Sequence, residues 1–291
     1  MLKTKYCLSL SLVFFAFYVS GQSYVELSVD NDLYFRTDHY YSSGIFLSYG
    51  KKKENHIQYW TFAQHIYNPS LRYTDDITIM DYPYSGWLFI QSEKEYLINE
   101  NSSYSYGIEL GVTGDASLAK TFQNFYHKTF LNLPELTWVG AQPQRIHFGI
   151  FGQINKVISL TNDIHLLGQV YSKLSSHTTN IIGRVGIMMG SKNLLPFKRT
   201  NINSNEDSTG IYFGTTQEYR PHDFTLSGSF RDDESALILP SIKYRNNFEV
   251  GIYARKDKWS LSVLYQIMSK FTPDQLFNKH EVLNITIRKS I

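Results

Sequence analysis

Most of the chain is patterned by a two-residue alternation of apolar and polar positions. In the clearest run, residues 104–113, tyrosine and aliphatic side chains alternate with small and polar ones. Such alternation predicts a β-strand with one apolar face and one polar face. Comparable runs begin near Tyr24 and Tyr41 and recur at residues 55–67, 84–96, 144–155, 163–172, 178–190, 209–219, 247–256, 258–268 and 280–289. The pattern therefore predicts about twelve strands and an all-β fold.

The polar faces of these strands suit the inside of a membrane barrel. They carry small and polar side chains, and no second apolar set is present to fill a dry core. This favours a transmembrane antiparallel β-barrel over a soluble β-sandwich or barrel, which also alternates and is the alternative fold. In the membrane barrel, one apolar face would contact lipid: Tyr104, Tyr106, Ile108, Leu110 and Val112. Residues 222–242 are ambiguous, and we expect an extended hairpin or a loop there.

Residues 117–131 break the alternation and show helical periodicity instead. Asp115 or Ser117 can cap the start of this helix. One side is mostly apolar, whereas Lys120, Gln123 and His127 recur at intervals of three and four and share another face. We therefore expect a short helix in a connection between strands, with His127 turned toward the strand ends.

The first residues predict export. Lys3 and Lys5 precede an apolar core, and Ser20-Gly21 offers the small residues of a cleavage site, so residues 1–21 are predicted to be a signal peptide and residues 22–291 the barrel. The only cysteine, Cys7, would leave with it, which excludes disulfides and thiolate metal sites.

Composition agrees with an outer-membrane location. The chain has 22 tyrosines and 19 phenylalanines, as expected for aromatic girdles at membrane interfaces. Removing the two lysines of the signal from 28 basic and 26 acidic residues leaves 26 of each. This balance argues against nucleic acid as a partner, because its binding needs a clustered basic surface.

Counting strands from a periplasmic N-terminus places the polar motifs at one end of the barrel. Residues 32–40, 68–83 and 114–143 would be long extracellular connections, whereas residues 51–55 and 97–103 would be periplasmic turns, the usual asymmetry of such barrels. The motifs at residues 30–32, 37–44, 81–87 and 123–127 all fall in these outer connections or at their strand edges. Hydroxyl, carboxylate, amide and imidazole groups gathered at one extracellular rim indicate a surface enzyme.

These motifs resemble those of the outer-membrane lipid A 3′-O-deacylases. Asn31-Asp32 matches the Asn-Asp after the first strand, and Asp38 with residues 41–44 matches an Asp followed by Tyr-Thr-x-Gly, with Ser42 in place of threonine. Residues 64–69 match Gln-x-x-Tyr-x-Pro, and residues 81–87 match Asp-Arg-Pro-Tyr-Ala-Gly-Trp. The remaining matches are matches of spacing: Gly114, Gln123, Asn124, His127 and Trp138.

The resemblance implies a barrel that removes an ester-linked acyl chain from the lipid A of lipopolysaccharide in the outer membrane, with Ca²⁺ as cofactor. It implies that His127 is the general base, that Asp32 is a calcium ligand, and that Asn31 and Ser42 are polar groups around the ester. Asn31 is a second candidate ligand, and further candidates for the metal are Asp30 and Glu135. Arg72 is a candidate for binding a phosphate of the substrate.

The chain departs from the family pattern at several positions. Leu133 stands where the family has an acidic residue, Tyr82 replaces the arginine of the Pro-Tyr motif, and Asp115 replaces the proline after Gly114. The metal ligands and the substrate are therefore left open by the sequence. The alternative function is a non-enzymatic barrel, a narrow pore or structural protein, on the same scaffold.

Overall fold

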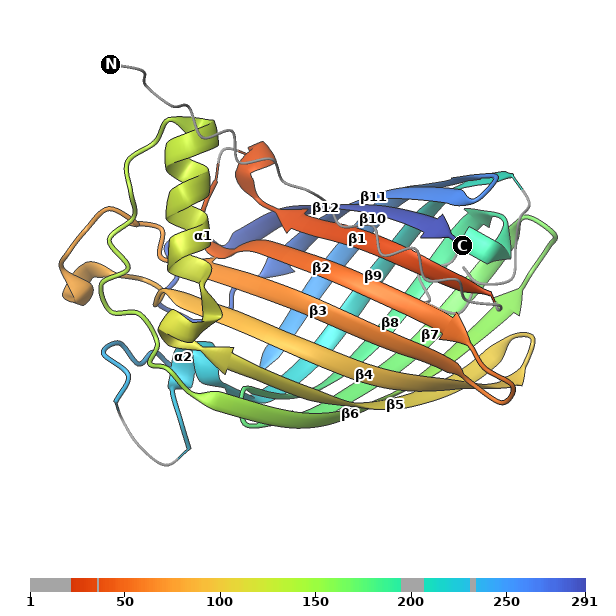
Figure 1. The fold of residues 1–291 in the computed structure, drawn as a ribbon, viewed down its shortest axis with the longest axis horizontal. Coiled ribbons are helices and arrows are strands. Elements are labelled where there is room, and N and C mark those ends of the chain that lie inside the picture. Colours follow the sequence, from red (N-terminus) through yellow and green to blue (C-terminus); the bar gives the residue numbers. More distant parts are fainter. Residues whose placement is uncertain (1–21, 36, 195–206, 231–233) are drawn as a thin grey trace, which may run out of the picture.

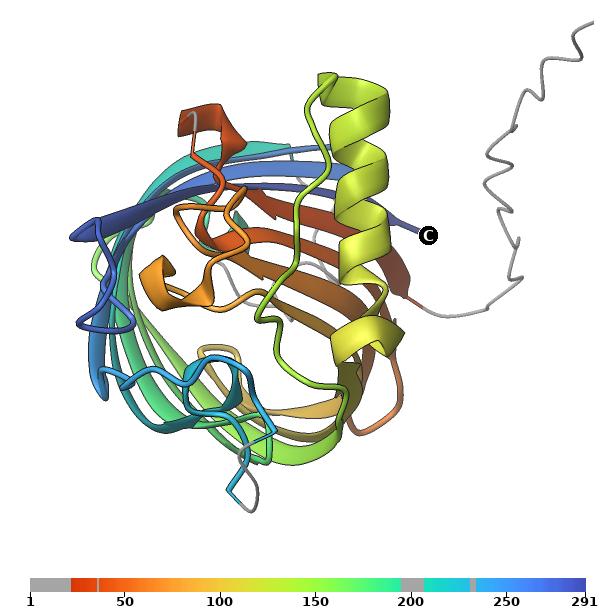
Figure 2. The same cartoon turned by 90° about the vertical axis from the view of Figure 1, so that its left-hand side faces the viewer.

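The computed structural model describes residues 22–35, 37–194, 207–230 and 234–291, which form one closed antiparallel β-barrel (Figures 1 and 2). Each strand pairs with its neighbours in sequence, and the first strand closes the barrel against the last. The strands are β1 (Ser23–Asn31), β2 (Tyr40–Lys52), β3 (Ile57–Asn68), β4 (Ser85–Asn99), β5 (Ser102–Thr113), β6 (Ile146–Ser159), β7 (Ile164–Ser175), β8 (Thr178–Gly190), β9 (Ser208–Asp223), β10 (Tyr244–Lys256), β11 (Trp259–Ser269) and β12 (Lys279–Ser290). The predicted fold is confirmed; the predicted signal peptide, residues 1–21, lies outside the described residues.

The outside of the barrel is apolar, as the alternation of the sequence predicts. On β5 the outward side chains of Tyr104, Tyr106, Ile108 and Leu110 are 42% to 54% exposed, while Glu109 between them is buried inside. One row of register partners across β1 to β6 consists entirely of exposed apolar residues, and we call it the lipid row: Leu27, Leu47, Phe62, Ile90, Leu110 and Phe148. No helix in the described part of the chain is long and apolar enough to cross a membrane.

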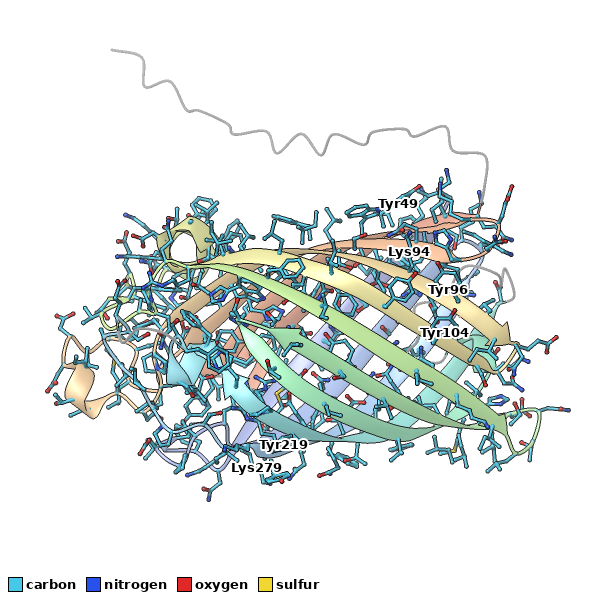
Figure 3. All side chains as sticks on the ribbon, turned by 90° about the horizontal axis from the view of Figure 1, so that it is seen from below. Tyr49, Lys94, Tyr96, Tyr104, Tyr219 and Lys279 are labelled. Carbon is cyan, nitrogen blue, oxygen red and sulfur yellow. The ribbon has the colours of Figure 1, made fainter. Side chains whose placement is uncertain are left out.

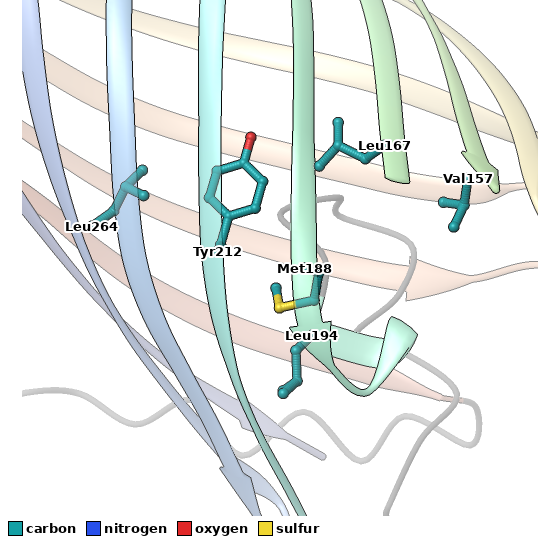
Figure 4. Packing of buried hydrophobic residues seen from close by; sticks show 6 residues of the cluster. All are labelled: Val157, Leu167, Met188, Leu194, Tyr212 and Leu264. Carbon is teal, nitrogen blue, oxygen red and sulfur yellow. The ribbon is translucent and has the colours of Figure 1, made fainter. Parts of the chain in front are cut away.

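The interior of the barrel is mostly polar and is crosslinked by ion pairs. Lys173 Nζ lies 3.2 Å from Glu109 Oε1, and Arg184 Nη2 lies 2.8 Å from Glu249 Oε1. Small apolar clusters also pack inside, and the one shown in Figure 4 comprises Val157, Leu167, Met188, Leu194, Tyr212 and Leu264. Apolar side chains outside and polar side chains inside are the reverse of a soluble barrel, as a membrane barrel requires.

Tyrosines lie on the outer surface toward both ends of the barrel. Tyr49, Tyr96 and Tyr104 lie toward one end, as does Lys94, and Tyr219 lies toward the other, as does Lys279 (Figure 3). The rings of Tyr96 and Tyr104 stack with centroids 5.3 Å apart. Such rings are suited to the headgroup layer, where the ring meets hydrocarbon and the hydroxyl meets water.

The two ends of the barrel differ in the length of their connections. At one end the turns are short, namely residues 53–56, 100–101, 160–163 and 257–258. At the other end, called the outer end below, the connections are long, namely residues 32–39, 69–84, 114–145, 224–243 and 270–278. Two connections reverse this rule: residues 176–177 form a short turn at the outer end, and residues 191–207 form a long connection at the opposite end.

A helix lies outside the barrel wall at the outer end, across the ends of β1 to β4 (Figures 1 and 2). It comprises α1 (Ala119–Tyr126) and a π-helical turn (His127–Leu131), which confirms the helix predicted at residues 117–131. Its approach to the wall depends on Gly86 of β4, where any side chain would overlap with Ser117 and Ala119. Gln64 of β3 fixes the start of the helix by donating to the Ser117 carbonyl over 2.6 Å.

A β-bulge in β2 changes which side chains face outward. The register of β2 against β3 shifts between Tyr41 and Ser43, so Ser42 is the extra residue. Simple alternation predicts that Tyr41 faces outward like Ile45, four residues later, and this prediction is wrong: Tyr41 is buried and donates to Asp30 over 2.6 Å. The bulge reverses the direction of the side chains before Ser42 and leaves Ser42 without a register partner on β3.

Residues 222–242 contain no extended hairpin in their described part. β9 continues to Asp223, a single helical turn α2 (Phe224–Ser227) follows, and the described residues up to 242 are irregular. Of the two possibilities left by the sequence, the structure has the loop.

Candidate active site at the outer end

A pocket of about 130 Å³ lies between α1 and the outer surface of β1 and β2. Val29 and Ile45, two outward-facing strand residues, line one side, and Phe122 and Tyr126 of α1 line the other. Its polar lining groups are Asn31, Asp32, Asp38, Ser42, Ser43, Gln123 and His127. The pocket is therefore on the lipid-facing side of the wall and not in the lumen.

Asp38 is the common acceptor of this site. Its Oδ1 accepts hydrogen bonds from Ser42 Oγ and Asn68 Nδ2, both over 2.6 Å. Its Oδ2 lies 3.1 Å from His127 Nε2 and 3.4 Å from Arg72 Nε. Burial acts to raise the pKa of Asp38, but the contacts with His127 and Ser42 and the charge of Arg72 outweigh it and hold the pKa below its ordinary value. Asp38 is therefore an anion that joins strand, loop and helix.

His127 is held at the junction of α1 and the π-helical turn, and its side chain is 4% exposed. When the ring proton is on Nε2, beside Asp38, the lone pair of the neutral imidazole resides on Nδ1. That Nδ1 atom is buried and has no hydrogen-bond partner in the described residues. A buried acceptor without a partner is uncommon in folded proteins and is suited to bind a water molecule or a substrate group.

The face of α1 that carries His127 is anchored by its neighbours. Trp138 Nε1 donates to Gln123 Oε1 over 3.1 Å, and the Trp138 ring stacks on Tyr84 with centroids 5.1 Å apart. Asn124 closes a reciprocal pair with the Leu136 backbone, accepting from its N–H over 2.8 Å and donating to its carbonyl over 3.2 Å. These contacts explain the spacing of Gln123, Asn124 and Trp138 in the sequence. They hold the helix in place and thereby fix the position of His127.

Asp32 follows the last residue of β1 and is buried, with 1% exposure. Its Oδ2 accepts from the His39 N–H over 2.9 Å, and its Oδ1 lies 3.3 Å from Ser42 Oγ. It forms no ion pair with any described residue. Burial, followed by the charge of Asp38, raises the pKa of Asp32 to about 8, although hydrogen bonds act against the shift. The raised pKa reflects a buried carboxylate whose negative charge no neighbouring cation offsets.

The donor atoms around Asp32 fit a hard cation. Carboxylate, hydroxyl and amide oxygens from Asp32, Ser42 and Asn31 line the same pocket, and calcium prefers such oxygen ligands. Within the described residues, no group of three His, Cys, Asp or Glu side chains is placed to hold a metal. Further ligands would therefore come from neutral oxygens or water.

Asp81 joins three connections of the barrel beside the site. Asp81 accepts from the Ser70 N–H over 2.8 Å, from the Tyr40 hydroxyl over 2.7 Å and from the Leu276 N–H over 3.0 Å. Tyr40 adopts a left-handed backbone conformation (φ 59°), which is uncommon for a bulky residue. Asp81 thus stabilises the strained entry to β2, next to the segment that carries Asp38 and Ser42.

The structure separates two of the candidate metal ligands from the pocket. Asp30 points into the lumen, where its Oδ1 accepts from Asn284 over 2.6 Å, and it lines a different cavity. Glu135 is exposed and pairs with Lys128 over 3.3 Å. Both side chains therefore lie outside the pocket: alternation turns Asp30 inward before the strand ends, and Glu135 is exposed beside Lys128.

The other sequence candidates come together. Asn31, Asp32, Ser42 and His127 line one pocket, and Arg72 reaches the edge of this group through Asp38. The three departures have ordinary structural roles. Leu133 donates its N–H to the His127 carbonyl over 3.0 Å, Tyr82 packs in a buried cluster with Tyr40 and Leu226, and Asp115 is exposed.

The sequence motif contains Asp38 but assigns it no role. Asp38 lies between Thr37 and a strand of uncertain register, so the sequence does not show what it contacts. The spacing of four residues between Asp38 and Ser42 is a usable signal, because side chains four residues apart lie on the same face of an extended chain. The bulge itself cannot be read from alternation.

The chain is similar to known proteins in part of its sequence and in its fold. The family model described as outer membrane protein LpxR matches residues 4–136. The solved structure of LpxR from Salmonella typhimurium is 15% identical with a TM-score of 0.79, over 91% of this chain and 99% of that one. The β domain of the Bordetella autotransporter BrkA is 12% identical with a TM-score of 0.45, over 92% of this chain and 98% of that one. No curated protein sequence matches the chain.

Fold and comparisons together define the class of the protein: it is an outer-membrane β-barrel. More narrowly, its barrel is similar in fold to that of LpxR. The family resemblance found in the sequence motifs is thereby confirmed.

Proposed function

We propose that the protein hydrolyses an ester-linked acyl chain of lipid A, with His127 as the general base and calcium as cofactor. The observation that carries this proposal is the contact between His127 and Asp38 in a pocket on the lipid-facing side of the wall. An ester in the outer leaflet lies beside such a pocket, whereas a lumen site would require the lipid to leave the membrane.

His127 and Asp38 would divide the proton chemistry between them. Asp38 accepts the Nε2–H and orients the ring. Nδ1 accepts a proton from a water molecule while the oxygen of that water forms a bond to the ester carbonyl carbon. Asp38 also stabilises the imidazolium produced in this step. The carbonyl is restored when the bond to the sugar oxygen breaks, and the proton on Nδ1 is transferred to that leaving oxygen. A fatty acid and a sugar hydroxyl are the products.

Asp32, with Asn31 and the Ser42 hydroxyl, would hold the cation. When bound, calcium supplies a positive charge that polarises the ester carbonyl and stabilises the oxyanion. The raised pKa of Asp32 supports this assignment, because a divalent ion offsets the cost of an anionic carboxylate buried at this position. Arg72, which is 24% exposed, would contact a phosphate of the lipid A headgroup.

Mass spectrometry of lipid A tests the proposal. Purified protein, refolded in detergent, is incubated with lipopolysaccharide and calcium, and the lipid A is then analysed. We expect a product lighter by one ester-linked acyl chain, together with the free fatty acid. If no acyl chain is released from lipid A or from phospholipid, the protein is a non-enzymatic barrel on this scaffold.

A further inference from the structure

One flank of α1 exposes a continuous strip of apolar side chains. The strip follows helical spacing and comprises Leu118 (57% exposed), Phe122 (40%), Phe125 (54%), Tyr126 (36%) and Phe130 (66%). Their rings contact one another, since Phe130 lies 5.4 Å from Tyr126 and 6.1 Å from Phe125 between centroids. No described segment of the chain covers this strip, which we call the aromatic flank.

The aromatic flank differs from the rest of the helix surface. Ala119, Gln123 and His127 are buried against the barrel wall. Lys120 is exposed and lines a separate cavity beside Trp138, on the side of the helix opposite to Phe122. The helix therefore has three sides: one toward the wall, one polar, and one aromatic.

The direction of the aromatic flank follows from the pocket. Phe122 and Tyr126 line the pocket opposite Val29 and Ile45, which are register partners on β1 and β2. The lipid row begins two residues nearer the middle of these strands, at Leu27 and Leu47. Because a strand rises about 3.3 Å per residue, the two rows are separated by roughly 7 Å along the wall. The aromatic flank thus faces along the wall toward the membrane.

The row at the pocket leads across the wall to an exposed apolar residue at the start of β6. Register partners carry it from Val29 and Ile45 through Gln64, Leu88 and Val112 to Ile146. Ile146 is 80% exposed at the outer end of β6, beyond the region that α1 covers. The lipid-facing surface therefore extends to the level at which the helix crosses the wall.

We propose that α1 is an interfacial helix whose aromatic flank is inserted into the acyl chains of the outer leaflet. Aromatic and aliphatic residues on one side of a helix, with a lysine on another, are the pattern of helices that lie in a membrane surface. Large exposed apolar patches on a protein mark contact with lipid or another protein. Lipid is the occupant favoured here, since the flank is continuous with a surface that already contacts lipid.

Insertion of the flank has a consequence for the pocket, which rests on the proposed function. The open side between Phe122, Tyr126 and the strand residues Val29 and Ile45 would face acyl chains. A lipid would then enter sideways from the leaflet with its acyl chain leading, and its ester would reach His127 without exposure of the chain to water.

Spin labels test the position of the flank without any measurement of activity. Cysteine is introduced at Phe125, Phe130, Lys120 or Leu110 in a Cys7→Ser background, so that each protein has a single label. The refolded barrels are placed in phosphatidylcholine vesicles. Collisions with oxygen report hydrocarbon, and collisions with a water-soluble nickel chelate report water.

We expect labels at Phe125 and Phe130 to resemble the label at Leu110 in the lipid row, with oxygen collisions dominating. The label at Lys120 should show the opposite preference. Equal nickel accessibility at Phe125 and Lys120 would overturn the proposal. Magnetic broadening between labels at Phe125 would also overturn it, because it would show a second copy of the chain on the flank.

A double variant, Phe125→Ser with Phe130→Ser, tests the consequence for the substrate. Neither residue lines the pocket, so kcat should be retained while KM for lipid A in vesicles rises about tenfold or more. An unchanged KM would contradict lateral entry. If the unmutated protein hydrolyses nothing, the proposed function fails, and the spin-label result still decides where the helix lies.

Discussion

Nε2 of His127 lies 3.1 Å from Oδ2 of Asp38, although the two residues come from different connections of the barrel. The contact exists because α1 packs on the outside of the wall and places His127 over the start of β2. When the ring proton is on Nε2, Nδ1 is the nitrogen that is left to accept a proton. The proposed hydrolysis therefore depends on the packing of α1 against the barrel wall.

Asp38→Asn should show whether the carboxylate acts on the catalytic step or on the binding of the lipid substrate. The amide keeps the shape and an acceptor for Ser42, but it cannot stabilise an imidazolium, so we expect kcat to fall on the order of 10²-fold or more with little change in KM. Asp76→Asn, in an exposed position of the neighbouring connection, is the matched control and should have wild-type rates. Steady-state kinetics on lipid A measures both; wild-type kcat in Asp38→Asn would contradict the assignment.

Removal of calcium should abolish hydrolysis, and its return should restore it. Asp32→Asn weakens the only fully buried anionic ligand in the proposed set, so calorimetry should show calcium binding to the unmutated protein and little to the variant. Glu135→Gln should bind calcium normally, because Glu135 is exposed away from the pocket. Full turnover in excess chelator would reject the metal.

Gly86→Leu should uncouple barrel assembly from activity. Its side chain would overlap with Ser117 and Ala119, so α1 must move away from the wall and take His127 from Asp38. We expect a heat-modifiable, folded barrel on gels that has lost hydrolysis. Gly168→Leu is the control, since a Cβ at Gly168 meets nothing within 4 Å. Equal activity of the two variants would show that the seating of the helix is unimportant.

Leu110→Arg tests the lipid row. An arginine on the lipid face costs about 2–4 kcal/mol near the membrane midplane, so the fraction of assembled barrel should fall. Leu110→Phe preserves the apolar surface and should assemble like the unmutated protein. The heat-modifiable band after refolding into vesicles gives the comparison, and equal assembly of the two variants would mean that Leu110 does not face lipid.

Local pattern was sufficient to predict the strands and the helix. Alternation persists over whole strands, and residues 117–131 change period at one place, so both elements follow from neighbours in sequence. The outward face of β5 from Tyr104 to Leu110 was predictable for the same reason.

The details of the site depend on pairing between strands, which a single sequence does not encode locally. The bulge at Ser42 reverses the direction of Tyr41, and it brings Ser42 to Asp38 through a register shift against β3. Asp30 and Asp32 look equivalent in the sequence, but one ends in the lumen and the other in the pocket. The contact of Asp38 with His127 required the position of α1 on the wall.

The central claim is tested most directly by the rate of acyl release from lipid A by His127→Asn. The variant keeps the helix and some hydrogen bonding but has no base, so the barrel should fold normally and the rate should fall about 10²–10⁴-fold. Lys120→Ala, on the exposed side of the same helix, should remain near the unmutated rate. A folded His127→Asn protein that releases the acyl chain at the unmutated rate would contradict the account.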